Sequence, residues 1–211
     1  TKIAAALGID SRMVNGRRIT DAEMLRVVTM VYGGLVNKNI VAQLQTRGGN
    51  ALGLTGADMD VVRSHKREVK DVDYGFVGDV DTVDGSRLAG LIESGVVPVM
   101  APLTHDGKGN ILNTNADTIA SETAKALSAY YDVTLVYAFE KAGVLADSDD
   151  EGSVIRCLDK ENFEKYVADG TIAGGMLPKL ENAFAAIKAG VKRVAITKDT
   201  DLEVRCGTMI E

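Results

Sequence analysis

Runs of apolar residues alternate along the chain with segments in which apolar residues recur every three or four positions. The runs predict buried strands at residues 51–54, 96–101, 133–139 and 191–197. The helical spacing predicts helices at residues 21–45, 86–94, 118–130, 160–168 and 179–189. Because strands and helices follow one another in turn, the sequence predicts an α/β fold, a three-layer αβα sandwich around a mainly parallel sheet with right-handed crossovers.

Polar and glycine residues mark where several of these elements begin and end. Thr20-Asp21-Ala22-Glu23 has the pattern of a capping box at the start of the long helix, and Gly33-Gly34 within that helix predicts a kink or close packing against another helix. Residues 61–83 alternate apolar and polar side chains, which predicts β-hairpins that could form a lid. Turns are expected at Asn15-Gly16 and at residues 105–110.

Three short polar side chains, Asn113, Asn115 and Asp117, occupy alternate positions where a strand is expected to meet the helix at 118–130. In open α/β sheets, ligands bind at the carboxyl ends of strands. Helix capping alone would account for one of these residues, because Asn and Asp are preferred at that position, and would leave two unexplained. We therefore interpret the segment as a candidate functional site.

Composition argues against several classes of function. The chain has 211 residues, 45% hydrophobic and 26% charged, which suits one globular domain or two closely joined lobes. No apolar stretch approaches the roughly 18 residues of a membrane span and no signal peptide is recognisable, so we expect a cytoplasmic protein without a membrane partner. The net charge of −6, without a basic stripe interleaved with aromatic residues, argues against a nucleic-acid partner.

Neither the cysteines nor the histidines form a metal-binding pattern. Cys157 and Cys206 match no metal-ligand spacing, and we expect them to be reduced thiols. His65 and His105 are isolated in polar, turn-like stretches. We expect both histidines to be exposed to solvent, and we expect no metal site.

Three further segments could contact an anionic ligand. Arg17 and Arg18 precede a helix N-terminus, where guanidinium groups grip carboxylate or phosphate, although solvated arginines explain them equally well. Lys179 is expected to begin a helix after a glycine-containing loop, an arrangement that fits phosphate binding or a plain surface lysine. Residues 53–58 are interpreted first as a turn.

Four of these segments occur in a characteristic order: Asn15–Thr20 followed by Asp21, Gly53–Asp58, Asn113–Asp117 and Gly174–Lys179. In this order they resemble the N-acetylglutamate kinases of the amino acid kinase family, and the resemblance extends from Thr1 to Ile210. It implies an α/β sandwich in which an N-terminal lobe, residues 1–130, binds the acyl amino acid and dimerises. A C-terminal lobe, residues 131–211, is expected to bind the nucleotide.

The resemblance implies a kinase of arginine biosynthesis, which uses ATP to phosphorylate the side-chain carboxylate of N-acetyl-L-glutamate and gives N-acetyl-L-glutamyl 5-phosphate and ADP. Mg²⁺ would enter with ATP, bound mainly by phosphate oxygens and water. A glutamate side chain, with a pKa of about 4.3, is already ionised at neutral pH, so this nucleophile needs no general base. Charge repulsion is the obstacle, and in-line positioning and cations must offset it.

Each functional residue is assigned by its match to a family motif. Arg18 is expected to hold the α-carboxylate of the acyl amino acid, and Asn113 to bind the same substrate. Of the two catalytic residues, Asp117 is expected to organise lysines by ion pairing, and Lys179 to stabilise the transition state near the leaving phosphate. The implied nucleotide-binding residues are Glu140, Lys141, Ala142, Gly143, Val144, Leu145, Thr171, Ile172 and Ala173. Glu140 stands where many relatives have Asp, which puts its ribose contacts in doubt.

Within its 211 residues, the chain lacks the Lys-x-Gly-Gly and His-Gly-Gly-Gly loops with which the family begins. In the family, those loops supply a catalytic lysine and backbone amides that surround the phosphoryl group. We therefore expect this chain alone to be inactive, and we expect a preceding segment that carries the two loops and their strands.

Several alternatives stay open. Other amino acid kinases act on free glutamate, aspartate, carbamate or UMP, but Arg18 in its motif favours an acylated glutamate. N-succinyl-L-glutamate would need a further cation, for which Arg17, Lys66 and Arg67 are available. A non-catalytic binding or regulatory relative would not require both Asp117 and Lys179. Relatives pair through the helix that corresponds to Asp21–Gln45, so we expect a homodimer, while hexamers and arginine feedback are undetermined.

Overall fold

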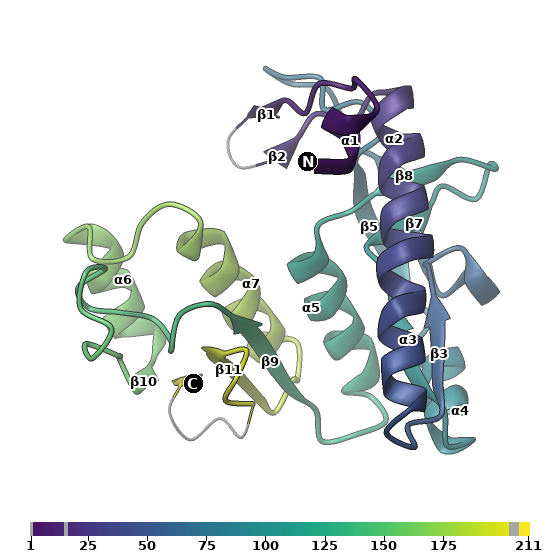
Figure 1. Ribbon diagram of the computed structural model, residues 1–211. Coiled ribbons are helices and arrows are strands. Elements are labelled where there is room, and N and C mark those ends of the chain that lie inside the picture. Colours follow the sequence, from purple (N-terminus) through teal and green to yellow (C-terminus); the bar gives the residue numbers. More distant parts are fainter. Residues whose placement is uncertain (1, 15–16, 203–206) are drawn as a thin grey trace. The chain divides into compact units, whose positions relative to one another are not determined.

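The structure, a computed structural model, describes residues 2–14, 17–202 and 207–211 (Figure 1). The chain forms two compact units, Thr1–Ile119 and Ala120–Glu211. The division falls within helix α5 (Ala116–Leu127), whereas the sequence analysis placed the boundary after residue 130. No helix in the described ranges is long and apolar enough to cross a membrane.

A continuous helical segment dominates the first unit, as the spacing at residues 21–45 predicts. It consists of α2 (Ala22–Val28), the π-helix η1 (Thr29–Val36) and α3 (Asn37–Gln45) (Figure 1). Gly33-Gly34 lies in the wider π-helical stretch, where the backbone N–H of Asn37 donates to the carbonyl of Tyr32, five residues earlier. A Cβ on Gly33 would lie 3.2 Å from Leu103 Cδ1, so the packing is close, but it is against the strand Leu103–His105 and not against another helix as predicted.

Asp21 caps this helix, so the capping box predicted for Thr20 and Glu23 is wrong. The Asp21 carboxylate accepts from the backbone N–H of Met24 at 2.9 Å. Thr20 is fully buried, and its hydroxyl donates instead to the backbone carbonyl of Arg18 at 3.3 Å. The Thr20 side chain therefore forms its hydrogen bond outside the helix and does not cap it.

Two sheets contain most strands of the first unit. The strands expected at 51–54 and 96–101 are confirmed as a parallel pair, β3 (Ala51–Leu54) and β6 (Val97–Met100), and Asn37 Nδ2 anchors α3 to this pair by donating to the Val99 carbonyl at 2.8 Å. The hairpin expected within 61–83 is confirmed as β4 (Val62–Lys66) and the antiparallel β5 (Gly78–Val83). The second sheet has the order β5-β4-β7-β8, and its last two strands are β7 (Leu103–His105) and β8 (Ile111–Asn113). The other elements are α1 (Lys2–Ala6), β1 (Met13–Val14), β2 (Arg17–Arg18), η2 (Asp58–Asp60) and α4 (Gly85–Glu93).

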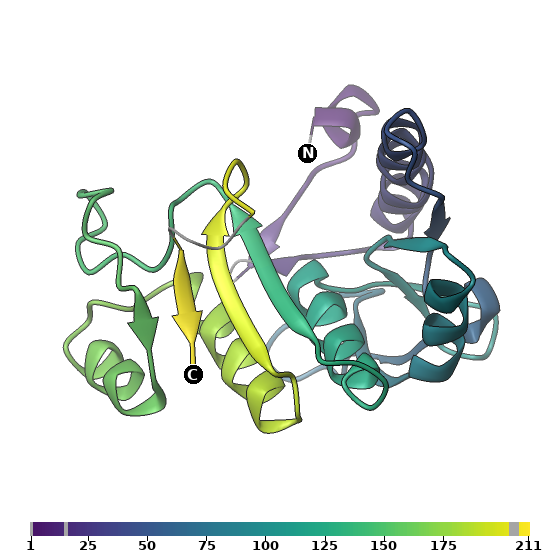
Figure 2. The same ribbon diagram turned by 90° about the horizontal axis from the view of Figure 1, so that it is seen from below.

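The second unit is built on a mixed sheet with the order β10-β12-β11-β9. Its strands are β9 (Thr134–Phe139), β10 (Cys157–Leu158), β11 (Arg193–Lys198) and β12 (Thr208–Ile210), and its helices are α6 (Lys160–Ala168) and α7 (Met176–Lys188). β9 pairs in parallel with β11, which is antiparallel to β12. Figure 2 shows α7 along one face of the sheet, where Leu180, Ala183 and Ala186 join its buried core. The α/β fold class is confirmed.

The turn between β7 and β8 is organised by Asp106, as the composition of residues 105–110 predicts. Its carboxylate accepts from the Asn110 side chain at 2.7 Å and from the backbone N–H groups of Lys108 and Asn110 at 2.7 and 3.0 Å. These bonds, with the Asn110 side chain first, lower the pKa of Asp106 to about 2.

Asp106→Asn should therefore destabilise the protein at neutral pH, with an effect that shrinks as the pH falls. A folded-state pKa lower than the unfolded value of 3.8 contributes stability above that value, and this contribution is lost as the pH falls through about 2. Denaturant unfolding from about pH 2 to 7 measures the difference. Asp10→Asn, at an exposed carboxylate outside the turn, is the control. A destabilisation that does not vary with pH would contradict this account.

Candidate functional site

A cavity of about 350 Å³ in the first unit, here called the acceptor cavity, is lined by both residues that the sequence assigned to substrate binding. Arg18 reaches it from β2, which pairs with β1, and Asn113 reaches it from the end of β8. Arg17 and Arg67 also line the cavity, so three arginines and one carboxylate, Asp79, line one space. The excess of positive charge suits an anion that carries a carboxylate. The predicted turn at Asn15-Gly16 lies outside the described residues.

The start of α5 forms another wall of the acceptor cavity. Asn115 is the cap of this helix, because its side-chain oxygen accepts from the backbone N–H of Thr118 at 3.0 Å. The helix begins at Ala116, two residues before the predicted start. Ala116 and Thr118 line the cavity, while Asp117 lies between them, half-buried in the first turn, and does not. The two asparagines of the motif thus have separate structural positions.

A backbone contact ties the arginine-bearing segment to the long connection between β4 and β5. The N–H of Thr20 donates to the Tyr74 carbonyl at 2.9 Å, and the Thr20 carbonyl accepts from the Phe76 N–H at 2.6 Å. Gly75 lies between these partners with φ +72°, and a Cβ there would come within 2.2 Å of the Thr20 carbonyl oxygen. The contact therefore requires glycine at this position.

Gly75→Ala should destabilise the protein by more than the cost of the left-handed backbone, which is about 1–3 kcal/mol. The added methyl group would force Thr20 away from residues 74–76. Gly95→Ala is the matched control, because Gly95 has φ +76° and open space around its missing Cβ. Thermal unfolding compares the two variants, and equal losses would show that the close approach to Thr20 contributes nothing.

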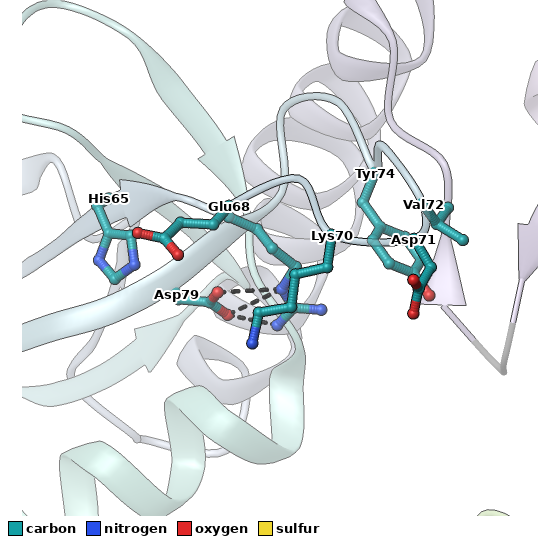
Figure 3. A pocket seen from close by; sticks show the side chains of 8 residues that line it. His65, Glu68, Lys70, Asp71, Val72, Tyr74 and Asp79 are labelled. Atoms are coloured by element: carbon teal, nitrogen blue, oxygen red, sulfur yellow. Dashed lines mark hydrogen bonds and ion pairs between the residues drawn. The ribbon is translucent and has the colours of Figure 1, made fainter.

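Arg67 and Asp79 line both the acceptor cavity and a second cavity of about 350 Å³. Figure 3 shows the second cavity from close by, with Asp79 among the residues that line it. Arg67 Nε donates to both carboxylate oxygens of Asp79, at 3.1 and 3.0 Å, and its Nη2 also donates to this carboxylate. These hydrogen bonds lower the pKa of Asp79 and keep it ionised. The guanidinium carbon lies 5.7 Å from the centre of the Tyr74 ring. Arg67 is therefore held in place before any ligand arrives.

A cavity of about 490 Å³ in the second unit, here called the donor cavity, collects nearly all the residues predicted to bind a nucleotide. Ala142 is the exception among the nine. The predicted residues that line it are Glu140, Lys141, Gly143, Val144, Leu145, Thr171, Ile172 and Ala173. Thr208 holds the loop after β9 in place, since its hydroxyl accepts from the Val144 N–H at 2.8 Å.

Lys179 lines the donor cavity from the fourth position of α7, so the prediction that it begins a helix is wrong. The helix begins at Met176, after Gly175. The Lys179 ammonium lies 4.9 Å from the centre of the Tyr137 ring and 5.8 Å from that of Phe139. Aromatic faces attract a cation, and they orient this half-buried lysine within the cavity.

Among the described residues, neither histidine nor Cys157 lines the acceptor or the donor cavity, although His65 lines the second cavity beside Arg67 and Asp79. His105 is not exposed as predicted: its side chain is only 16% exposed, and its Nε2 lies 2.8 Å from Asp60 Oδ1. Cys157 is an exposed free thiol whose pKa is raised by partial burial and by Glu211, and Cys206 lies outside the described residues. Across the part of the chain that the structure covers, no cluster of three or more potential metal ligands occurs.

Sequence reasoning missed several residues of the acceptor cavity. Tyr32 reaches it from the π-helix, and Thr114 follows Asn113. The pairing of Arg67 with Asp79 depends on the register of β4 and β5, in which His65 lies opposite Asp79. Alternation of apolar and polar residues predicts such strands but not their register, so no signal in the sequence pointed to this pair.

Comparison with known proteins agrees with this arrangement. The amino acid kinase family matches residues 1–198. An acetylglutamate kinase of Bacteroides thetaiotaomicron is 72% identical over 211 residues, which cover 100% of this chain and 82% of that protein. Another, from Brachyspira hyodysenteriae, is 40% identical over 196 residues, 93% of this chain and 67% of that protein. The crystal structure of smu.665 from Streptococcus mutans has a TM-score of 0.83 and 28% identity, covering 99% of this chain and 80% of that one.

The chain therefore belongs to the amino acid kinase family. A carbamate kinase from Giardia lamblia shares the fold, with a TM-score of 0.63 and 16% identity over 99% of this chain and 76% of that one. Within the family, the high similarity is to acetylglutamate kinases, as the order of the motifs predicted.

Proposed function

We propose that this protein transfers the γ-phosphoryl group of ATP to the side-chain carboxylate of N-acetyl-L-glutamate, a step of arginine biosynthesis. A carboxylate oxygen forms the new bond to phosphorus as the bond to the ADP oxygen breaks, giving N-acetyl-L-glutamyl 5-phosphate and ADP. The proposal rests on one observation above all: Arg18 and Asn113 line a single cavity. The identity to acetylglutamate kinases supports the choice of substrate.

In this proposal, Arg18 holds the α-carboxylate in the acceptor cavity by paired hydrogen bonds, and Asn113 contacts the same molecule. The side-chain carboxylate is ionised at neutral pH and attacks without a general base. The lining carries three arginines against the one carboxylate of Asp79, so a free amino acid would bring its ammonium group into a net positive space, and acylation removes that charge. The charge of the cavity therefore favours an acylated acceptor.

The donor cavity is proposed to hold ATP, with the segment after β9 and residues 171–173 against the nucleotide. Lys179 would offset negative charge on the leaving phosphate, and Asp117 would organise lysine side chains. Mg²⁺ would be held mainly by phosphate oxygens and water. Such binding needs no cluster of three or more protein ligands, and the described residues form none. The ion would draw charge from the transferring group.

One variant of this function is favoured by a specific observation. Arg17 and Arg67, suggested as partners for the extra carboxylate of N-succinyl-L-glutamate, both line the acceptor cavity, while Lys66 is not among its lining residues. Lys66 instead lies 5.1 Å from the centre of the Phe76 ring. A succinylated acceptor is therefore the second candidate substrate, and direct competition with the acetylated one distinguishes them.

The decisive assay measures ADP release from ATP with N-acetyl-L-glutamate, N-succinyl-L-glutamate and free L-glutamate, using the complete gene product that contains this chain. We expect turnover with at least one acylated substrate and little with free glutamate. The 211-residue chain assayed in parallel tests whether it is inactive by itself. If the complete gene product binds acyl glutamate but does not turn it over, the kinase proposal is wrong and the protein is a non-catalytic relative.

Lys179→Ala should lower kcat by about 100-fold or more, because a cation that acts on the transition state affects turnover more than binding. The KM for the acyl glutamate should change little. Lys188→Ala, at the exposed C-terminal end of the same helix, removes the same charge and should leave kcat unchanged. Steady-state kinetics with both substrates varied checks this. A loss confined to the KM for the acyl glutamate would contradict the assigned role.

We also propose that the protein forms a homodimer through the long helix of the first unit. Four large apolar side chains of this helix are 43–57% exposed: Met30, Leu35, Val36 and Ile40. Exposed apolar side chains grouped on one element are typical of a protein–protein interface. Burying these side chains against a second copy would stabilise a pair. Sedimentation of the complete gene product reports the state of association.

A further inference from the structure

We propose that Thr20 is a positioning residue, whose hydroxyl sets the orientation of Asn113 relative to Arg18 in the acceptor cavity. The assignment of these two residues to substrate binding rests on the proposed function. The role of Thr20 rests on geometry alone. Among the described residues, Thr20 is one of the few polar residues that are fully buried, at 0% exposed.

The hydroxyl of Thr20 has a hydrogen bond on each side. It donates to the backbone carbonyl of Arg18 at 3.3 Å, and it accepts from the side-chain amide nitrogen of Asn113 at 3.0 Å. A hydroxyl has one proton, so donation toward Arg18 leaves only its lone pairs for Asn113. The amide of Asn113 must therefore turn its NH₂ group toward Thr20. Its carbonyl oxygen is the end directed away from Thr20.

The backbone makes the same connection independently of the side chain. The peptide groups of Thr20 are bonded to Tyr74 and Phe76, and the Phe76 carbonyl accepts from the Asn113 N–H at 2.8 Å. Three segments distant in sequence thus meet at one buried residue. Without the hydroxyl, the backbone contact would persist, but the Asn113 amide would be free to rotate by a half-turn.

That rotation matters because the two ends of an amide have opposite hydrogen-bonding roles. A rotated Asn113 would present a donor where the ligand meets an acceptor. The expected consequence is weaker binding of the acyl amino acid, with no change in the binding of ATP. A purely structural threonine would instead affect stability without selecting one substrate.

The test compares Thr20→Val, which keeps the shape but removes the hydroxyl, with Thr20→Ser, which keeps the hydroxyl. Thr20→Val should raise the KM for the acyl glutamate on the order of 10-fold and leave the KM for ATP unchanged. Thr20→Ser should restore most of the loss. Val28→Ala, at a buried apolar position of α2, is the control for general destabilisation and should not change either KM.

A double-mutant cycle and a spectroscopic readout complete the test. In an Asn113→Ala background, Thr20→Val should have less than about a 2-fold effect on KM, because the group it orients is absent. In ¹⁵N-labelled protein without substrate, the side-chain NH₂ resonances of Asn113, identified with Asn113→Ala, should shift in Thr20→Val and not in Thr20→Ser. The NMR result holds even if the complete gene product turns over neither acyl glutamate, so failure of the proposed function remains distinguishable.

Three results would overturn the proposal. They are full additivity in the cycle, a rise in KM in Val28→Ala equal to that in Thr20→Val, and unchanged Asn113 resonances in Thr20→Val. If Thr20→Val does not fold, proton exchange in the unsubstituted protein decides the question. One Asn113 NH₂ proton bonded to buried Thr20 should exchange slowly with solvent, and fast exchange of both would refute the bond.

Discussion

The contact between the backbones of Thr20 and residues 74–76 ties the strand that carries Arg17 and Arg18 to the connection between β4 and β5. Arg17 and Arg18 form β2, a two-residue strand that among the described strands pairs with β1 alone, so strand pairing does little to hold it against the rest of the unit. The close approach at Gly75 supplies the attachment, and it does so without a side chain. The position of Arg17 and Arg18 at the acceptor cavity therefore depends on a backbone contact that only glycine allows at position 75.

Much of the fold follows from the periodicity of apolar residues. The helix over 160–168 and the strand over 51–54 lie where their patterns place them, because each has an uninterrupted pattern and clear ends. Short strands such as β10 and β12 left no periodic signal, since two or three residues are too few to show one. The cap was misread for a different reason: Thr20 and Asp21 are both good caps, and the hydrogen bonds that the Thr20 hydroxyl forms with the Arg18 carbonyl and the Asn113 side chain decided between them.

The site could be predicted in part. Arg18 and Asn113 were placed by motif, and the residues after β9 fell together in the donor cavity because a βαβ-type order brings strand ends to one edge. Arg67 was named as an available cation, but its pairing with Asp79 could not be found in this way, because that pairing depends on strand register. Lys179 was recognised, but its position within α7 was not, because Pro178 and the glycines before Met176 suggest a loop, whereas Met176–Lys179 with Pro178 form the first turn of the helix.

The π-helical stretch η1 gives the long helix a property that an ordinary helix lacks. By widening the turn, it sets the rotation between α2, whose Met24 and Val28 face the core, and α3, whose Asn37 is bonded to β6. Each half of the helix thus directs its buried side chains at a different part of the unit. Tyr32, in the π-helical stretch that joins the two halves, lines the acceptor cavity. Substitutions along this helix act locally, but gaining or losing one residue within η1 would turn one half by about 100° against the other. The number of residues in η1 therefore fixes the rotation of α2 relative to α3, whichever side chains occupy the stretch.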